Sequence, residues 1–362
     1  MSSRLPGQSN FKRLPKAMPA FLTLAMALSL SLSVGWALAD DVVLVPGASI
    51  KQAIGGRVRG QIQSESPGEV VVTLGTSTTS VPNDQIASIR YDGQPATLQL
   101  AETRAAAGQL AEAAELFKKA AGEAADKPYV RQMALYREAS ALAELALVEP
   151  DRTKDAKDRL LRFVQAHPSS RHIIPARENL ARLQLNTGDF AGAEATIAEL
   201  AKLPKAADRA GVLRAKVLAR QGRHDKAISE LDRLIATFPD RSTGQREARL
   251  AKAESLVGMK KYKEAEGLVR QVIAAAPAED VAAQSAACNT LGDCLRADNR
   301  PKEALLAYLH TDLLYSKDKQ EHPRALFQIE KLFRLLKQDG RADEYAQRLR
   351  QEYPRSQWLT SK

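Results

Sequence analysis

The segment Gly222-Arg223-His224-Asp225-Lys226-Ala227, followed by Leu231 and closed by Pro239, decides the fold of this chain. Its glycine suits a short turn, and its alanine lets a neighbouring backbone approach closely. Apolar residues then recur at helical spacing, at Ala227, Ile228, Leu231, Leu234, Ile235 and Phe238. Proline cannot continue a helix, so it ends this one. The segment therefore predicts a turn followed by an amphipathic helix.

The same pattern recurs along most of the chain, at intervals of 34 to 43 residues. The recurring small residue is Ala113, Ala156, Ala193, Ala227, Ala265 and Ala304. Twelve residues before five of these stands a second small residue: Ala101, Ala181, Ala215, Ala253 and Gly292. Prolines follow five of them after 11 to 15 residues, at Pro128, Pro168, Pro204, Pro239 and Pro277. Because a twelve-residue offset crosses one turn between antiparallel helices, these eleven small residues are predicted repeat-packing positions in six or seven stacked hairpins.

On these residues the chain resembles tetratricopeptide repeats over about residues 96–354. The resemblance implies a mainly α, tetratricopeptide-type helical solenoid, with an array over 95–354 and a tail at 355–362. Two units depart from the pattern: one has a longer link, Glu149 to Lys154, and the last, Pro323 to Pro354, carries Phe333 and Tyr345 where small residues are expected. A departing last unit is typical of a capping repeat.

Residues 40–94 have a different composition, which predicts a small all-β module. Residues 40–95 hold 7 of the 20 glycines, and 17 of these 56 residues are Val, Ile or Thr. We expect strands near Val58, over Val70–Leu74 and over Ile86–Tyr91. The pattern resembles small SH3-like or Sm-like barrels. With four bases, six acids and Tyr91 as its single aromatic residue, the module lacks the surface that nucleic acids need.

The first 39 residues have the order of features typical of a secretory signal peptide. Four cations and no acid are combined with an uncharged run from Ala17 that ends in Ala37-Leu38-Ala39. Cleavage after Ala39 predicts export to the periplasm or cell envelope. The alternative is an uncleaved anchor in the inner membrane, because 23 uncharged residues are enough to span a bilayer.

Composition argues against several classes of site. The hydrophobic fraction of 44% is high enough for a packed core, whereas two cysteines and five histidines leave little for a disulfide framework, a metal cluster or a His-based active site. Cys288 and Cys294 are six residues apart in an expected helix, about 9 Å, which is too far for a disulfide. We find no nucleophile or nucleotide-binding motif, and expect neither enzyme activity nor a cofactor.

The resemblance implies that the first helices of the units form a concave face that holds a protein or peptide. The residue after each small first-helix position is expected to face this groove: Glu102, Arg182, Lys216, Glu254 and Asp293. The alternative for these five is that they are ordinary solvated residues. We therefore expect a non-catalytic scaffold of the bacterial envelope that binds a protein partner. The alternative is a surface-associated or membrane-anchored protein whose basic array holds an anionic polymer or lipid.

Overall fold

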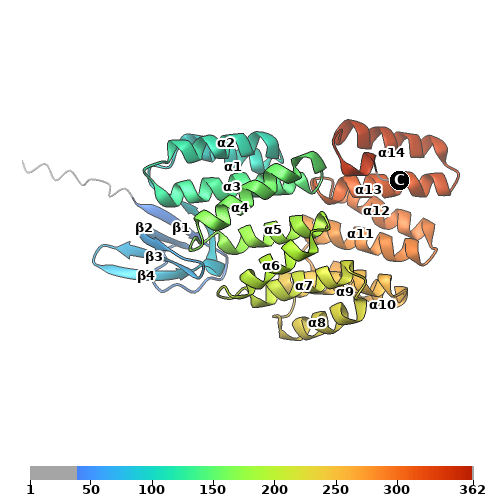
Figure 1. Ribbon diagram of the computed structural model, residues 1–362, viewed down its shortest axis with the longest axis horizontal. Helices are drawn as coiled ribbons and strands as arrows, with labels where there is room; N and C mark the ends of the chain where they lie inside the picture. Colours follow the sequence, from blue (N-terminus) through green and yellow to red (C-terminus); the bar gives the residue numbers. More distant parts are fainter. Residues whose placement is uncertain (1–38, 361–362) are drawn as a thin grey trace, which may run out of the picture. The chain divides into compact units, whose positions relative to one another are not determined.

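The computed structural model describes residues 39–360, and the predicted signal segment lies outside them except for Ala39. A small antiparallel sheet is followed by fourteen α-helices in the described residues, which confirms the mainly α solenoid with an N-terminal β module (Figure 1). No helix in this part of the chain has the length and apolar character needed to cross a membrane.

The sheet has five strands: β1 (Asp40–Leu44), β2 (Arg57–Glu65), β3 (Glu69–Leu74), β4 (Ser77–Pro82) and β5 (Ile86–Arg90). Their order is β4-β3-β2-β1-β5, and every neighbouring pair is antiparallel. The long β2 pairs with β1 through its first half and with β3 through its second half. Gly60 lies where the pairing changes, and a Cβ there would meet the Thr73 carbonyl oxygen at 2.1 Å.

The small β module is present, but the barrel implied by the resemblance to SH3-like or Sm-like domains is not closed. β4 and β5 are the two outer strands of the sheet, and the short 3₁₀ turn Asn83–Gln85 joins them without bringing them into register. Helices complete the core instead, because apolar residues of the sheet such as Val58 and Val72 share one buried cluster with Leu98, Phe117 and Met133 of the first helices. A sheet covered in this way needs no closure to bury its apolar face.

The helices form seven consecutive antiparallel hairpins within residues 96–352. The first helices of the hairpins are α1 (Ala96–Ala106), α3 (Pro128–Ala146), α5 (Ile173–Asn186), α7 (Ala207–Arg220), α9 (Thr243–Gly258), α11 (Val281–Ala297) and α13 (Glu321–Leu335). The second helices are α2 (Leu110–Glu123), α4 (Thr153–Ala166), α6 (Phe190–Ala201), α8 (His224–Thr237), α10 (Tyr262–Ala275), α12 (Pro301–Leu314) and α14 (Asp339–Glu352).

The turns inside the hairpins repeat one backbone device. The residue after the cap of the first helix has a positive φ, as at Gly188 and Gly222. The next N–H then reaches back into the last turn: Asp189 donates to the Gln184 carbonyl at 2.8 Å. This satisfies a helix-end carbonyl and reverses the chain. The hairpin of α3 and α4 departs, since residues 147–152, including the 3₁₀ turn Pro150–Arg152, join its helices.

The eleven small residues named above are all buried between helices, each on the helix of its hairpin that the repeat pattern assigns. Gly292 shows the closest approach, because a Cβ there would lie 2.5 Å from Cζ of the buried Tyr308. The last hairpin corrects the expectation for Phe333 and Tyr345. Its buried small residue is Ala342, 38 positions after Ala304, while the rings of Phe333 and Tyr345 pack against each other with centroids 5.5 Å apart.

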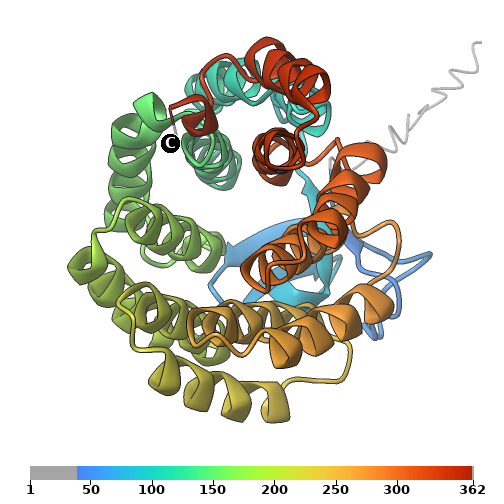
Figure 2. The ribbon, with the colours of Figure 1, turned by 90° about the vertical axis from the view of Figure 1, so that its right-hand side faces the viewer.

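The C-terminal residues return to the second hairpin. A short 3₁₀ turn, Gln357–Leu359, lies against the end of α3, where Gln357 donates from its backbone N–H to the Val148 carbonyl at 2.9 Å and from Nε2 to the Leu147 carbonyl at 2.7 Å. Trp358 packs on Phe327 of α13 with ring centroids 5.3 Å apart. Figure 2 shows the helices of residues 96–352 around a central space, with the C-terminal segment meeting α3.

Candidate partner-binding groove

Two adjoining cavities of about 410 and 360 Å³ lie on the inner side of the helical array. They share Leu147, Arg182, Ala282, Asp318 and Gln320, so they form one continuous hollow. We call its lining the interior groove, and it consists of Ala143, Glu144, Leu147, Asn179, Arg182, Leu185, Asn186, Lys216, Arg220, Thr243, Arg246, Glu247, Leu250, Glu254, residues 280–283, Ala286, Thr290, Asp318, Gln320, Glu321 and Arg324.

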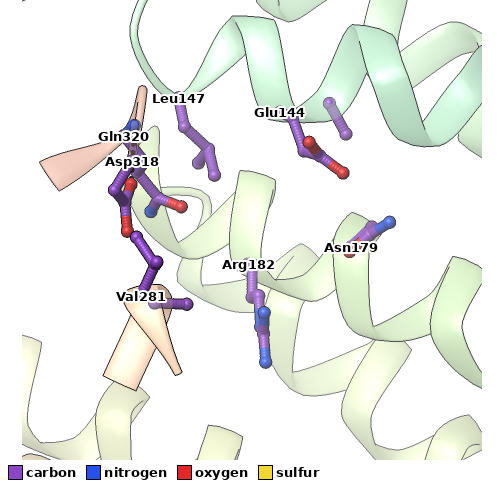
Figure 3. Close-up of a pocket in the computed structure, with 9 residues that line it drawn as sticks. Glu144, Leu147, Asn179, Arg182, Val281, Asp318 and Gln320 are labelled. Carbon is purple, nitrogen blue, oxygen red and sulfur yellow. Dashed lines mark hydrogen bonds between the residues drawn. The ribbon is translucent and has the colours of Figure 1, made fainter. Parts of the chain in front are cut away.

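Helical spacing explains why these residues face one hollow. Lys216 and Arg220 are four residues apart on α7, as are Leu250 and Glu254 on α9, so each pair lies on one side of its helix. The facing wall on α11 is built from small residues such as Ala283 and Ala286, which leave room for a guest side chain. In Figure 3, Glu144, Asn179 and Arg182 surround the hollow opposite Val281 and Asp318.

Several charges of the groove are already paired within the protein. Arg246 Nη2 lies 2.8 Å from Asp280 Oδ2, and Arg324 Nη1 lies 3.1 Å from Glu321 Oε2. The contact between Arg182 and Glu247 is looser, at 3.7 Å. Such pairs shape the walls of the groove, and their attraction to a guest is reduced accordingly.

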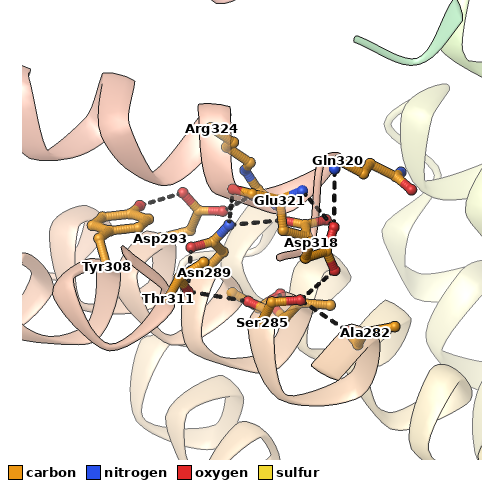
Figure 4. Close-up of polar contacts among 12 residues, drawn as sticks. Ala282, Ser285, Asn289, Asp293, Tyr308, Thr311, Asp318, Gln320, Glu321 and Arg324 are labelled. Carbon is orange, nitrogen blue, oxygen red and sulfur yellow. Dashed lines mark hydrogen bonds and ion pairs between the residues drawn. The ribbon is translucent and has the colours of Figure 1, made fainter. Parts of the chain in front are cut away.

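A network of hydrogen bonds holds the α11–α13 side of the groove in place (Figure 4). Asp318 accepts from the Ser285 hydroxyl at 2.6 Å and from the backbone N–H groups of Gln320 and Glu321, both at 2.9 Å. Asn289 Nδ2 donates to Oε2 of Glu321 at 2.8 Å. These contacts order the segment between α12 and α13, so this wall is formed before any partner binds.

Five charged groove residues have no ion pair within residues 39–360: Lys216, Arg220, Glu254, Glu144 and Asp318. Asp318 is held by hydrogen bonds instead. Two cations thus stand on α7 and one carboxylate on α9, on neighbouring first helices. Glu144 lies across the hollow as an exposed residue, and the partial loss of water around its carboxyl between the groove walls raises its pKa in spite of the nearby Arg137. The open part of the groove therefore offers both signs of charge, with the cations together on one helix.

The structure brings three of the five expected groove residues to the hollow: Arg182, Lys216 and Glu254. Asp293 is placed elsewhere, because it accepts from the Tyr308 hydroxyl at 2.6 Å and is paired with Arg324. Glu102 also lies outside the hollow, on α1, where burial raises its pKa against the lowering effect of Arg137.

Sequence reasoning missed Asn179, Arg220, Leu147 and Asp318. The first two could have been found, since Asn179 lies three residues before Arg182 and Arg220 four residues after Lys216. Leu147 and Asp318 could not, because Leu147 lies in the link inside the second hairpin and Asp318 in the link between the sixth and seventh hairpins. Only the return of the array brings these two segments together.

The reactive thiols and the possible metal-ligating residues outside the groove are buried or scattered in the described part of the chain. Cys288 and Cys294 are free thiols inside α11, and burial raises the pKa of Cys288 to about 11 and that of Cys294 to about 12. No group of three or more His, Cys, Asp or Glu residues among residues 39–360 is arranged to hold a metal ion.

Comparisons with known proteins agree with the repeat fold. Family models described as tetratricopeptide repeat match residues 178–242 and 218–288. Among solved structures, the Rap protein complexed with competence and sporulation factor is similar, with a TM-score of 0.50 and 12% identity, over 73% of this chain and 76% of that one. No curated protein sequence matches.

Two further solved structures are similar at lower scores. A tetratricopeptide repeat protein from Parabacteroides merdae aligns over 70% of this chain and 91% of its own, with 14% identity and a TM-score of 0.47. PilW, a type IV pilus biogenesis factor, aligns over 62% and 96%, with 16% identity and a TM-score of 0.41. At such identities these likenesses concern the fold alone.

Proposed function

We propose that this tetratricopeptide-type solenoid is a non-catalytic scaffold that holds a segment of a partner protein in its interior groove. The observation that carries the proposal is the hollow itself, which is lined from six helices and keeps Lys216, Arg220 and Glu254 without ion pairs. The similar Rap structure is a complex with competence and sporulation factor, which supports a protein-binding role for this fold.

The charges indicate what the partner segment carries. An acidic side chain placed beside α7 pairs with Lys216 and Arg220, and a basic side chain beside α9 pairs with Glu254. The small wall of α11 accepts an apolar side chain between them. A segment with alternating charge and an apolar residue fits this arrangement better than a uniformly acidic tail.

The site of action belongs to the same proposal: an exported scaffold of the bacterial cell envelope, in the periplasm. Its support is the pattern of residues 1–39, with cations, an apolar run and Ala37-Leu38-Ala39. A fusion of residues 1–60 to an alkaline phosphatase, which is active only after export, tests this step. Activity that survives replacement of the apolar run by polar residues would contradict it, and the mass of the purified chain distinguishes cleavage from anchoring.

A second candidate is a surface-associated protein that holds an anionic polymer or lipid. It rests on residues 202–233, which carry nine bases and four acids. Four of these bases are already paired: Lys202 with Glu199, Lys205 with Asp84, Arg209 with Glu178 and Arg214 with Glu230. This pairing weakens the patch, so the groove is the better candidate. Binding to a polymer should collapse as salt is raised.

Affinity capture from an envelope extract tests the groove. The variant Arg182→Glu/Lys216→Glu reverses two groove charges and is expected to lose the captured protein. The matched control, Lys226→Glu/Arg233→Glu, reverses two exposed charges on α8, outside the groove. Equal capture by both variants and the unchanged protein would refute the groove assignment.

A further inference from the structure

Helix α12 exposes a stripe of leucines on the outer surface of the array. Leu306 and Leu313 are seven residues apart and are 62% and 71% exposed, and Leu314 beside them is 64% exposed. On a helix, positions seven apart lie nearly in line, so these side chains form one apolar ridge. The buried Ala304 and Tyr308 show that the opposite side of α12 already faces the core.

The ridge is particular to this hairpin. Leu306 and Leu313 stand two and nine positions after the buried alanine of their second helix. The same two positions hold Glu115 and Gly122, Asp158 and Gln165, Ala195 and Lys202, Ser229 and Ala236, Gly267 and Ala274, and Glu344 and Gln351 in the other hairpins. Large apolar side chains at both positions are therefore not required by the repeat, and they need another explanation.

The adjoining second helix offers the complementary surface. On α10 the two positions are Gly267 and Ala274, both exposed, and a Cβ on Gly267 would meet nothing within 4 Å. The two helices are neighbours at the surface, because Arg300 at the start of α12 lies 2.6 Å from Glu266 of α10. One face of the molecule thus carries the leucine ridge of α12 beside a strip of small residues, Gly267 and Ala274, on α10. The two strip residues occupy the same repeat positions as Leu306 and Leu313.

The charges at one end of these helices are complementary as well. Lys302 and Lys317 flank the ridge, and Glu264 and Glu279 flank the strip, all four exposed and without an ion pair within residues 39–360. When α12 of one copy runs parallel to α10 of another, Leu306 faces Gly267 and Leu313 faces Ala274. The same register places Lys317 next to Glu279, whereas at the other end Lys302 falls opposite the exposed Lys263, with Glu264 one residue further on.

We propose that this face is the interface of a homodimer with a two-fold axis parallel to α10 and α12. Such an axis brings α12 of each copy onto α10 of the other, so the ridge and the strip are used twice. Ridges that pack into grooves are the usual geometry of helix contacts. The interface lies on the second helices and leaves the interior groove, lined by first helices, open to a partner.

Sedimentation velocity of the purified protein over a concentration series tests the dimer. The weight-average mass is expected to rise from one chain toward two. Leu306→Glu/Leu313→Glu should raise the dissociation constant by at least about 100-fold, because four apolar side chains per dimer lose their burial. The control Ser229→Glu/Ala236→Glu changes the same positions on α8 and should leave the constant unchanged.

Four further variants distinguish this geometry from nonspecific apolar association. Gly267→Leu/Ala274→Leu adds apolar surface but fills the strip, so it should weaken association, whereas stronger association would overturn the proposal. Lys317→Glu and Glu279→Lys should each weaken the dimer, and the double variant should restore it. A protein that stays monomeric at all concentrations, or that instead floats with phosphatidylglycerol vesicles through Leu306 and Leu313, would also overturn it.

Discussion

Gln357 donates its backbone N–H to the carbonyl of Val148 at 2.9 Å, although more than two hundred residues separate them in the chain. Its side chain reaches the Leu147 carbonyl at 2.7 Å. Both acceptors follow the last turn of α3, where helix carbonyls lack partners within the helix. The C-terminal residues therefore cap a helix near the beginning of the array.

Replacing Gln357 with Ala should loosen this contact. The variant keeps the main-chain bond and loses the side-chain bond, which is worth about 1 kcal/mol. We expect faster hydrogen exchange of amides at the end of α3 and in residues 355–360, with no change in α7 and α8. Gln351→Ala, on the exposed side of α14, is the control. Identical exchange in both variants would show that the contact adds no stability.

Gly292→Ala should destabilise the sixth hairpin. Its new Cβ would stand 2.5 Å from Cζ of Tyr308, a ring that is fully buried and has little room to move. Overpacking of this kind costs about 1 to 3 kcal/mol. Urea unfolding measures the loss, and Gly122→Ala on α2 is the control, since that exposed glycine has free space and alanine favours helix. A stability gain in Gly292→Ala would contradict the close packing.

Asp312→Asn should lower the free energy of unfolding by about 2 kcal/mol, because the buried carboxylate loses its charged hydrogen bonds. The loss is limited because Arg348, which is one-third exposed, remains in contact with water. Asp312 accepts from Arg348 at 2.8 and 3.0 Å and contacts His322 Nε2 at 2.9 Å. The exposed pair of Asp343 and Arg334 gives the control Asp343→Asn, expected to change the unfolding free energy by less than about 0.5 kcal/mol.

The same carboxylate gives a dependence on pH. Burial by itself would raise the pKa of Asp312, but the hydrogen bonds from His322 and Arg348 outweigh it and hold the pKa well below its usual range. Its contribution is therefore present above the unfolded pKa of about 3.9 and is lost as pH falls below it. In acid titrations of stability, Asp312→Asn should show a smaller loss below pH 4 than the unchanged protein does.

His172 should destabilise the fold in mild acid. It is 8% exposed and stacked on Tyr136 with ring centroids 4.7 Å apart, and burial, with Arg171 and Arg137 nearby, lowers its pKa well below the ordinary value. The unfolded chain binds a proton below about pH 6.5 and the folded chain does not, so stability falls by up to about 1.4 kcal/mol per pH unit below that value.

His172→Phe keeps the stacking and removes the proton site, so the slope of stability between pH 6.5 and 5 should flatten. His167→Phe is a graded comparison, because His167 is less buried and its pKa is lowered by burial and by Arg131. It should flatten the slope less. A steeper slope in His172→Phe would contradict the burial argument.

The repeats were predictable from sequence because each hairpin sets its own spacing. Small residues must recur where paired helices touch, so Ala181 and Ala193 reveal one hairpin without reference to any other. The same rule extends to Ala342. Sequence reasoning missed this alanine because it placed the small positions of the last unit at Phe333 and Tyr345. In the sheet, β1 and β4 escaped notice, since Asp40–Leu44 adjoins the predicted cleavage site and Ser77–Pro82 is rich in Ser and Thr.

The groove was only partly predictable for the same physical reason. Local spacing places Arg182, Lys216 and Glu254 on the inner side of their own helices. Which residues stand opposite them depends on small rotations added up over seven hairpins, and no single segment encodes that sum. Asp318 therefore meets the neighbourhood of Leu147 without any sign of it in either segment.

The bond between Gln357 and Val148 also bears on how such a chain can change its length over generations. An open solenoid gains or loses a unit by duplication or deletion with little harm, since each unit touches only its neighbours. Here an extra unit between α4 and α13 would carry Gln357 away from Val148. The contact between Gln357 and Val148 therefore fixes the number of hairpins between them. Added units are compatible with this contact only outside the segment from Val148 to Gln357.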